Sequence, residues 1–266
     1  MEYHFVSMSD LKIEGVSHFL PRNVTKYGEY FLNLRLVRAR HTNYNIANKT
    51  TDQTSGKQIK SKERVAAHGE VFTNEREVNA MLDLVKAETE RLDSRFLEPA
   101  CGDGNFLIKI LERKLAICEA RVKAKQYTQL QYEQNSIMAV SSIYGIELLP
   151  DNAEACRKRL YDYYENQYQT LFKSKCKSDC LTSVEYILTK NIIVGDALTY
   201  RRVDNPNEWI HICEWSFIGN GKVNRRDYEF SYLVGEEAGD DLFSDLPAAE
   251  YKPVNFLKLN KESYGE

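Results

Sequence analysis

The sequence predicts an α/β fold in which helices flank a mostly parallel sheet. Three short apolar segments end in an acidic residue, at Glu98, Glu147 and Asp196, and each of the first two is followed by a longer stretch of helical periodicity. Apolar runs that alternate with amphipathic stretches are typical of consecutive strand–helix–strand units, whose strands pair in parallel. At 266 residues the chain can hold one such domain and an appendage.

Composition indicates a water-soluble globular protein. Hydrophobic residues make up 42% and charged residues 28% of the chain, and no apolar run approaches the roughly 18 residues of a membrane span. The stretch Met1–His4 lacks the basic start and apolar core of a signal peptide, so we expect a cytoplasmic protein without membrane contact. The six cysteines follow no framework spacing, which favours reduced thiols.

The net charge of -3 and the pI near 6.0 are unlike those of a stand-alone nucleic-acid-binding domain. The charge is uneven, however, because the first sixty residues are rich in Lys and Arg and the last thirty in Asp and Glu. A basic arm that contacts phosphates and a solvated surface both remain open as explanations.

Changes in composition divide the chain into three parts. Residues 1–62 form an N-terminal extension and a polar linker, in which the alternation at Tyr30–Leu36 fits a strand or a short helix and residues 41–62 are polar. The α/β domain is expected over residues 63–234. Residues 235–266 are expected to form an acidic, loop-like tail.

The first element of the α/β domain is expected to be a helix over residues 74–92. Thr73 or Asn74 can cap its start, and one face carries apolar side chains at helical spacing: Val78, Met81, Leu82 and Val85. The stretch Arg95–Leu107 then reads as a strand, a loop with two glycines, and the start of a helix that continues to about residue 124. Glycine tolerates positive φ, and the free N–H groups of a helix start favour a carboxylate or phosphate.

This loop differs from two common phosphate-binding loops. A dinucleotide-binding loop requires Gly or Ala where this chain has Leu107, and the Gly-Lys-Ser/Thr of a P-loop is absent. Further along, Ser142–Glu147 and Asn191–Val194 read as the second and third strands, and Pro150 opens the intervening helix.

The nine residues from Glu98 to Phe106 read Glu-Pro-Ala-Cys-Gly-Asp-Gly-Asn-Phe. They resemble the D/E-P-A-C-G-x-G-x-F motif of S-adenosylmethionine-dependent N6-adenine DNA methyltransferases, such as the modification subunits of restriction–modification systems. The resemblance covers about residues 69–198. It implies a Rossmann-like class I methyltransferase fold, S-adenosylmethionine as the cofactor, and transfer of a methyl group to DNA.

The resemblance also implies which residues bind the cofactor. Glu147 would accept hydrogen bonds from the ribose hydroxyls and Asp196 from the adenine amino group, while Thr73 lies in a partial match to the G-x-x-x-T-P element, with Asn74 in place of Pro. The implied set comprises Phe72, Thr73, Glu98, Pro99, Ala100, Cys101, Gly102, Gly104, Asn105, Phe106, Glu147, Asp196 and Ala197.

The catalytic motif of these enzymes, N/D/S-P-P-Y/F/W, is absent because no two prolines are adjacent. Asn205-Pro206 is one possible remnant. A second follows the strand-like Trp209–Cys213: Glu214 would accept from the target amine and Phe217 would stack on the flipped base. The alternative is that Glu214 and Phe217 are ordinary residues of the fourth strand.

The residues after Phe217 are too few for the rest of a methyltransferase sheet and a target-recognition domain. Either a separate specificity subunit reads the DNA within a hetero-oligomer, or the chain is a reduced relative whose fold is incomplete on its C-terminal side. The alternative function is a catalytically inactive cofactor-binding subunit or sensor. A zinc set of Cys176, Cys180, His211 and Cys213 has unusual spacing, so we expect exposed thiols near a helix end and no metal.

Overall fold

The structure, a computed structural model, describes residue 64 and residues 73–234 and 246–266. The expected N-terminal extension and linker, residues 1–62, lie outside the described residues. The described part is an α/β fold built on a four-stranded sheet in the order β1-β2-β3-β4. Its strands are β1 (Phe96–Glu98), β2 (Ile143–Glu147), β3 (Ile192–Asp196) and β4 (Arg201–Arg202). The first three are parallel and β4 is antiparallel to β3, which confirms the predicted fold class.

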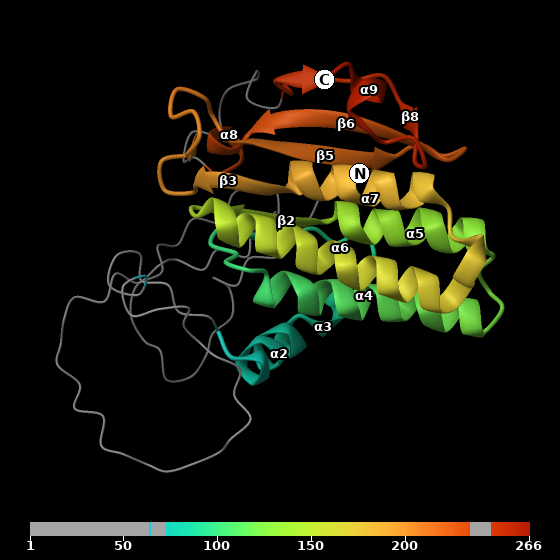
Figure 1. Cartoon of the computed structure of the whole chain (residues 1–266). Coiled ribbons are helices and arrows are strands. Elements are labelled where there is room, and N and C mark those ends of the chain that lie inside the picture. Colours follow the sequence, from blue (N-terminus) through green and yellow to red (C-terminus); the bar gives the residue numbers. More distant parts are fainter. Residues whose placement is uncertain (1–63, 65–72, 235–245) are drawn as a thin grey trace, which may run out of the picture.

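Four long helices lie side by side (Figure 1). They are α4 (Asn105–Lys123), α5 (Gln129–Ser141), α6 (Pro150–Phe172) and α7 (Ser178–Asn191), with a short 3-10 turn, η2 (Lys173–Lys175), between the last two. α5 and α7 lie in line with β2 and β3, before the amino ends of these strands (Figure 1). α4 leads away from the carboxyl end of β1 and α5 returns to the start of β2; α6 and α7 repeat this arrangement between β2 and β3. The predicted helix after the glycine loop is confirmed as α4, and Pro150 is the first residue of α6.

The helix expected over residues 74–92 is instead two helices, α2 (Glu75–Leu84) and α3 (Lys86–Thr89). Asn74 caps α2, since its Oδ1 accepts from the backbone N–H of Arg76 at 2.9 Å. The break falls at Val85, whose φ of -117° is not helical. The apolar periodicity continues across this break because Val85 itself packs against the core.

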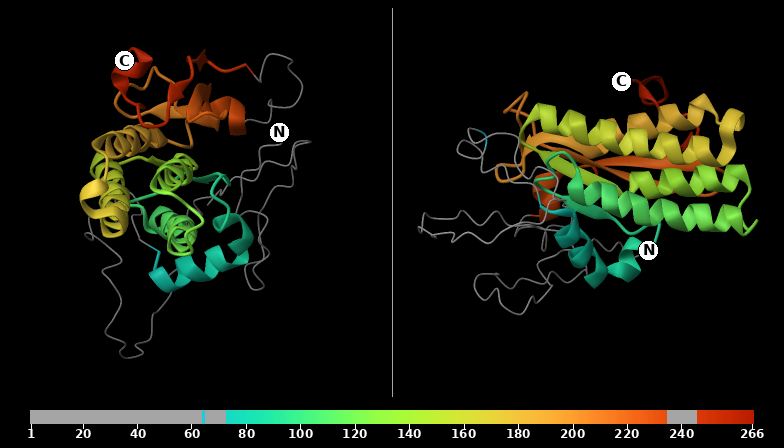
Figure 2. Two further views of the ribbon diagram at one scale, coloured as in Figure 1. Left: turned by 90° about the vertical axis from the view of Figure 1, so that its right-hand side faces the viewer. Right: turned by 60° about the horizontal axis from the view of Figure 1, so that its bottom comes forward.

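A second, antiparallel sheet lies next to α7 (Figure 2). Its hairpin is β5 (His211–Phe217) and β6 (Lys222–Glu229), and two short strands, β7 (Ala249–Glu250) and β8 (Val254–Asn255), pair with β6. The short helices α8 (Phe230–Val234) and α9 (Lys261–Tyr264) follow β6 and β8. The expectation of a loop-like tail was therefore wrong for residues 246–266. Their apolar side chains, such as buried Phe256 and Leu259, pack into the core.

The sequence suggested that β5 would be the fourth strand of the parallel sheet. The structure instead places β5 in the second, antiparallel sheet. Just before β5, the N–H of Ile210 donates to the carbonyl of Tyr200 at the carboxyl-end side of the first sheet. Further along β5, the indole Nε1 of Trp215 donates at 2.8 Å to Asn191, just before β3. β5 therefore runs opposite to β1–β3, and the hydroxyl of Tyr144 on β2 donates to the carbonyl of Cys213 at 2.9 Å.

Arg225 on β6 joins the second sheet to the helices and to the end of the chain. Its side chain is only 2% exposed and bonds to Asp227 through Nε at 2.7 Å and Nη2 at 2.5 Å. Its Nη1 donates to the Tyr186 hydroxyl on α7 at 2.6 Å and to the Glu266 carboxylate at 2.7 Å. The ring of Tyr251 lies 4.4 Å from the guanidinium carbon. None of the helices among the described residues is long and apolar enough to cross a membrane.

Candidate functional site

The carboxyl ends of the three parallel strands meet at one edge of the first sheet. Glu98 at the end of β1 is in register with Gly145, two residues before Glu147. Glu147 at the end of β2 is in register with Val194, two residues before Asp196. The three acidic residues predicted from the sequence are thus brought to the same edge, where open α/β sheets form ligand crevices.

Glu147 is hydrogen-bonded to the segments that follow β1 and β2 at this edge. Its Oε2 accepts from the backbone N–H of Gly102 at 2.8 Å, and its Oε1 accepts from the N–H of Leu149 at 3.0 Å and from Asn152 at 3.3 Å. The residue is 7% exposed. Since a carboxylate has about four lone-pair positions, this carboxylate can still accept from a ligand hydroxyl.

The loop after β1 requires its glycines. Gly102 and Gly104 have φ angles of 55° and 88°, in the left-handed region that glycine adopts without strain. A Cβ at Gly104 would also lie 2.7 Å from the Cys156 Sγ on α6. The loop is held at its start by the N–H of Cys101, which donates to the carbonyl of Ile146 at 3.0 Å. The backbone therefore passes tightly under this edge of the sheet.

Glu98 is a buried carboxyl group with one oxygen that lacks a partner. The residue is 2% exposed, and its Oε2 has no hydrogen-bond partner among the described residues. Burial raises the pKa of Glu98 to about 8, and a hydrogen bond from the backbone of Ala100 opposes this only in part. Such a group is suited to a cationic partner, because an ammonium ion would supply both the missing hydrogen bond and the counter-charge.

Asn105, the first residue of α4, links the loop to two other segments. Its Nδ2 donates to the carbonyl of Thr73 at 3.5 Å, and its Oδ1 accepts from Arg159 on α6 at 2.7 Å. Arg159 also forms an ion pair with Asp103 at 3.6 Å. Thr73 therefore lies beside the glycine loop, whereas Phe72 lies outside the described residues.

Cys101 is a packing residue of this loop. A Cβ added to Gly145 on β2 would lie 2.7 Å from the Cys101 Sγ. A hydrogen bond with the Cys156 thiol, together with burial, raises the pKa of Cys101 well above its usual range, so the sulfur is a neutral thiol. Phe106 is buried in the core beneath the loop. Both side chains support the loop from inside the core, and the backbone of Pro99 and Ala100 connects it to β1.

Asp196 is the last residue of β3 and lies at the β3 end of this edge. Its Oδ1 accepts from the backbone N–H of Leu198 at 2.9 Å, and both Asp196 and Ala197 are half-buried. The Leu198 side chain, in contrast, is 75% exposed. This end of the site therefore offers a fixed carboxylate beside an exposed apolar side chain.

Glu214 and Phe217 are not brought to this edge. The Glu214 carboxylate bonds to Arg95, just before β1, at 3.1 Å and to the Tyr228 hydroxyl at 3.3 Å. Because Arg95 precedes β1, Glu214 lies toward the amino ends of the parallel strands. Phe217 is three residues further along β5 and partly buried against the core. The amine-acceptor and base-stacking roles of these two residues stay predictions.

The described residues include no group of three or more side chains that could hold a metal ion. Cys180 lies on α7, where its thiol is within hydrogen-bond distance of the Tyr164 hydroxyl at 3.2 Å. All six cysteines are free, and the expectation of exposed thiols was wrong for Cys180 and Cys213, which are buried.

Two residues that help to form the site were missed in the sequence. Asn152 bonds to Glu147, and Arg159 bonds to Asn105. Both lie on α6, five and twelve residues after Glu147. Asn152 lies in the first helical turn after the strand-end acid Glu147, and this position in the sequence could have predicted its contact with Glu147. Nothing local marked Arg159, whose partner is 54 residues away.

Comparison with protein families agrees with this geometry. A family model described as MmeI, DNA-methyltransferase domain, matches residues 56–235, which is more than half of the chain. No curated protein and no solved structure matches the chain. The match includes all three strand-end acids and the glycine loop, and it confirms the predicted resemblance to DNA methyltransferases of restriction–modification systems. The chain therefore belongs to the family of the MmeI DNA-methyltransferase domain.

Proposed function

We propose that this DNA methyltransferase domain uses S-adenosylmethionine as its methyl donor and binds it at the carboxyl ends of β1, β2 and β3. The observation that carries the proposal is the meeting of Glu98, Glu147 and Asp196 at one sheet edge, within a chain of the MmeI methyltransferase family. When bound, the cofactor supplies an electrophilic methyl group. The residues at this edge of the sheet then need only bind the cofactor and orient its methyl group.

The residues of the edge fit the groups of this cofactor. The buried Oε2 of Glu98, which has no partner in the described part of the chain, suits the cationic amino group. The Glu147 carboxylate suits the ribose diol, and the half-buried Asp196 suits the exocyclic amine of adenine. Gly102 and Gly104, both at positive φ, place no side chain of their own between the loop and a ligand. The remaining residues predicted at this site, including Phe72 and Ala197, stay part of the proposal.

We further propose adenine N6 in DNA as the target, which is consistent with the family. Methylation of an exocyclic amine depends mainly on positioning, so the acceptors for the amine matter most. Glu214 and Phe217 stay our candidates in this chain for accepting the amine and stacking on the base. Because Glu214 is already bonded to Arg95, a separate specificity subunit or another part of the enzyme would have to complete the base pocket and read the sequence.

The domain boundaries at residues 63 and 234 and a cytoplasmic location belong to the same proposal. The family match over residues 56–235 supports the boundaries. Six free cysteines, five of them buried, are compatible with the reducing cytoplasm.

The test is transfer of a labelled methyl group to unmodified DNA, with and without a specificity subunit from the same host. Wild-type protein is compared with Glu147→Ala, and cofactor binding is measured for both by calorimetry. We expect binding and transfer by the wild type and loss of both in the variant. Binding without transfer in the presence of the subunit would instead favour the inactive cofactor-binding subunit, and absence of binding would contradict the proposal.

A further inference from the structure

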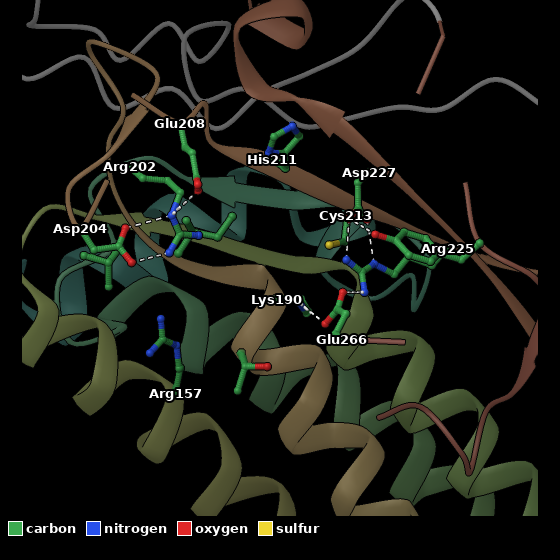
Figure 3. Close-up of a pocket in the computed structure, with 14 residues that line it drawn as sticks. Arg157, Lys190, Arg202, Asp204, Glu208, His211, Cys213, Arg225, Asp227 and Glu266 are labelled. Carbon is green, nitrogen blue, oxygen red and sulfur yellow. Dashed lines mark hydrogen bonds and ion pairs between the residues drawn. The ribbon is translucent and has the colours of Figure 1, made fainter. Parts of the chain in front are cut away.

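A cavity of about 510 Å³ lies beside β3, between α6, α7 and the second sheet (Figure 3). Its volume is within the range of roughly 300–1,000 Å³ that is usual for small-molecule sites. None of the residues proposed to bind the cofactor lines it. The cavity is therefore separate from the proposed cofactor site, and it lies at the β3 and β4 side of the first sheet.

The walls of the cavity are strongly charged. Three cations of the lining pair with carboxylates at 2.5 Å: Lys190 with Glu266, Arg202 with Asp204, and Arg225 with Asp227. Arg157, on α6, is different, because within the described part of the chain no carboxylate pairs with it. One cation of the lining thus lacks a counter-ion.

The guanidinium of Arg157 is only partly used by the protein. Its Nε and Nη2 donate to a single acceptor, the carbonyl of Ile192, at 2.9 and 2.6 Å. Three of the five N–H groups of the fork, including both on Nη1, stay available. Burial lowers the pKa of Arg157; the Cys156 and Cys101 thiols and the Glu154 carboxylate act in the opposite direction, and the positive charge of Arg202 adds a smaller lowering. A half-buried charge without a counter-ion is costly, and an anion would offset that cost.

Arg202 supplies a second guanidinium to the same end of the cavity. In Figure 3 the Arg157 side chain points from α6 into the cavity, toward the side on which Arg202 lies. The partners of Arg202 are Asp204 and Glu208, whose side chains are 58% and 60% exposed. Exposed ion pairs of this kind are weak and screened by salt, so they can rearrange around a ligand.

The other carboxylates of the cavity do not oppose an anion at this end. Asp227 is neutralised by Arg225, and Glu266 bonds to both Lys190 and Arg225. These four residues form a closed charge network on the far side from Arg157 (Figure 3). Among the described lining residues, Arg157 is therefore the cation without an ion pair, and Arg202 is a neighbouring cation whose two carboxylate partners are exposed.

We propose that this cavity binds a phosphate group, with Arg157 as its main ligand and Arg202 as the second. Planar guanidinium groups donate paired N–H bonds to phosphate oxygens, and two of them facing one site can share the charge of a phosphate. The phosphate belongs either to the backbone of DNA or to a small compound such as a nucleotide. Both sources present the same chemistry to the two arginines.

The test uses two probes, inorganic pyrophosphate by calorimetry and a short DNA duplex by fluorescence anisotropy. Each is titrated into wild-type protein, Arg157→Gln and Lys158→Gln. Lys158 is a matched control because it is the next residue of α6, carries the same charge, does not line the cavity, and is 72% exposed with Asp162 as its partner. We expect Arg157→Gln to weaken binding at least about tenfold and Lys158→Gln to leave it unchanged.

The two probes identify the source of the phosphate. Weaker binding of DNA by Arg157→Gln indicates the DNA backbone, and weaker binding of pyrophosphate alone indicates a small phosphate compound. Since Arg157→Gln also loses its bonds to Ile192, thermal unfolding is measured in parallel. Arg202→Gln, whose side chain bonds only to exposed carboxylates, provides a second variant. Affinities for both probes that do not differ between wild type and these two variants would overturn the proposal.

Discussion

The backbone N–H of Gly102 donates to the Oε2 of Glu147 at 2.8 Å, so the loop after β1 is tied directly to the end of β2. The residue proposed to hold the ribose therefore also fixes the loop proposed to lie under the rest of the cofactor. Binding and loop geometry at this edge depend on the same carboxylate.

Replacement of Glu147 by Gln should weaken cofactor binding by about ten- to a hundredfold. The amide would present an NH2 group toward Gly102 or Leu149, both of which are themselves donors. Calorimetric titration of S-adenosylmethionine measures the effect. Glu154→Gln, an exposed site on α6, is the matched control, and equal affinities of the two variants would contradict the role of Glu147.

The buried Glu98 should make stability depend on pH in an unusual direction for an acid. Its pKa is raised from 4.5 to about 8 in the folded protein, so the folded state holds the proton more tightly than the unfolded state. This group therefore stabilises the fold fully below pH 4.5, and its contribution is lost as pH rises to about 8, at about 1.4 kcal/mol per pH unit.

Glu98→Gln mimics the protonated group and should remove that slope. Urea unfolding across this pH window gives the free energy of unfolding of the wild type and of the variant. The contributions of the other titrating groups cancel in the difference between the two. A constant difference in the free energy of unfolding would show that Glu98 is ionised throughout.

Gly145→Ala should destabilise the fold by about 1–3 kcal/mol through overpacking. The new Cβ would lie 2.7 Å from the Cys101 Sγ and 2.9 Å from the Leu107 Cδ1. Cys101→Ala makes room on one side, so the double variant should lose less stability than the sum of the two single variants. Additive losses in urea unfolding would indicate that these positions do not contact each other.

Glu214→Gln should lower the free energy of unfolding by up to about 3 kcal/mol, since it removes the charge that pairs with Arg95 in a nearly buried site. Replacing both members with apolar side chains should recover part of this loss. If Glu214 instead serves as the acceptor for the target amine, methyl transfer will be abolished while stability stays unchanged. Unfolding and transfer assays on the same preparation separate the two roles.

The part of the fold that the sequence predicted is the part with local signals. The strands that end at Glu98 and Glu147 are short apolar runs, and the loop between Cys101 and Gly104 requires glycine for steric reasons. These features fix the parallel sheet and bring the three acids to one edge.

The part that was missed depends on distant partners. The first half of α5 is polar in sequence, yet Glu133 within it is fully buried, because it accepts from the Tyr168 hydroxyl and from Lys177, 35 and 44 residues away. Glu214 has its partner Arg95 at a separation of 119 residues. From the local sequence alone, such residues are predicted to be exposed or catalytic. Their charged and hydroxyl partners are far away in the sequence and are identified only from the folded structure.

The bonds of Arg225 have a consequence for how the molecule opens. One side chain connects β6, α7 and the last residue of the chain, so none of these segments can separate without exposing the guanidinium or its acceptors. Local opening should therefore be cooperative rather than a gradual fraying of residues 246–266. Amide hydrogens in β6, in the neighbouring turn of α7 and in the strands β7 and β8 should exchange with solvent as one unit, with a shared opening free energy.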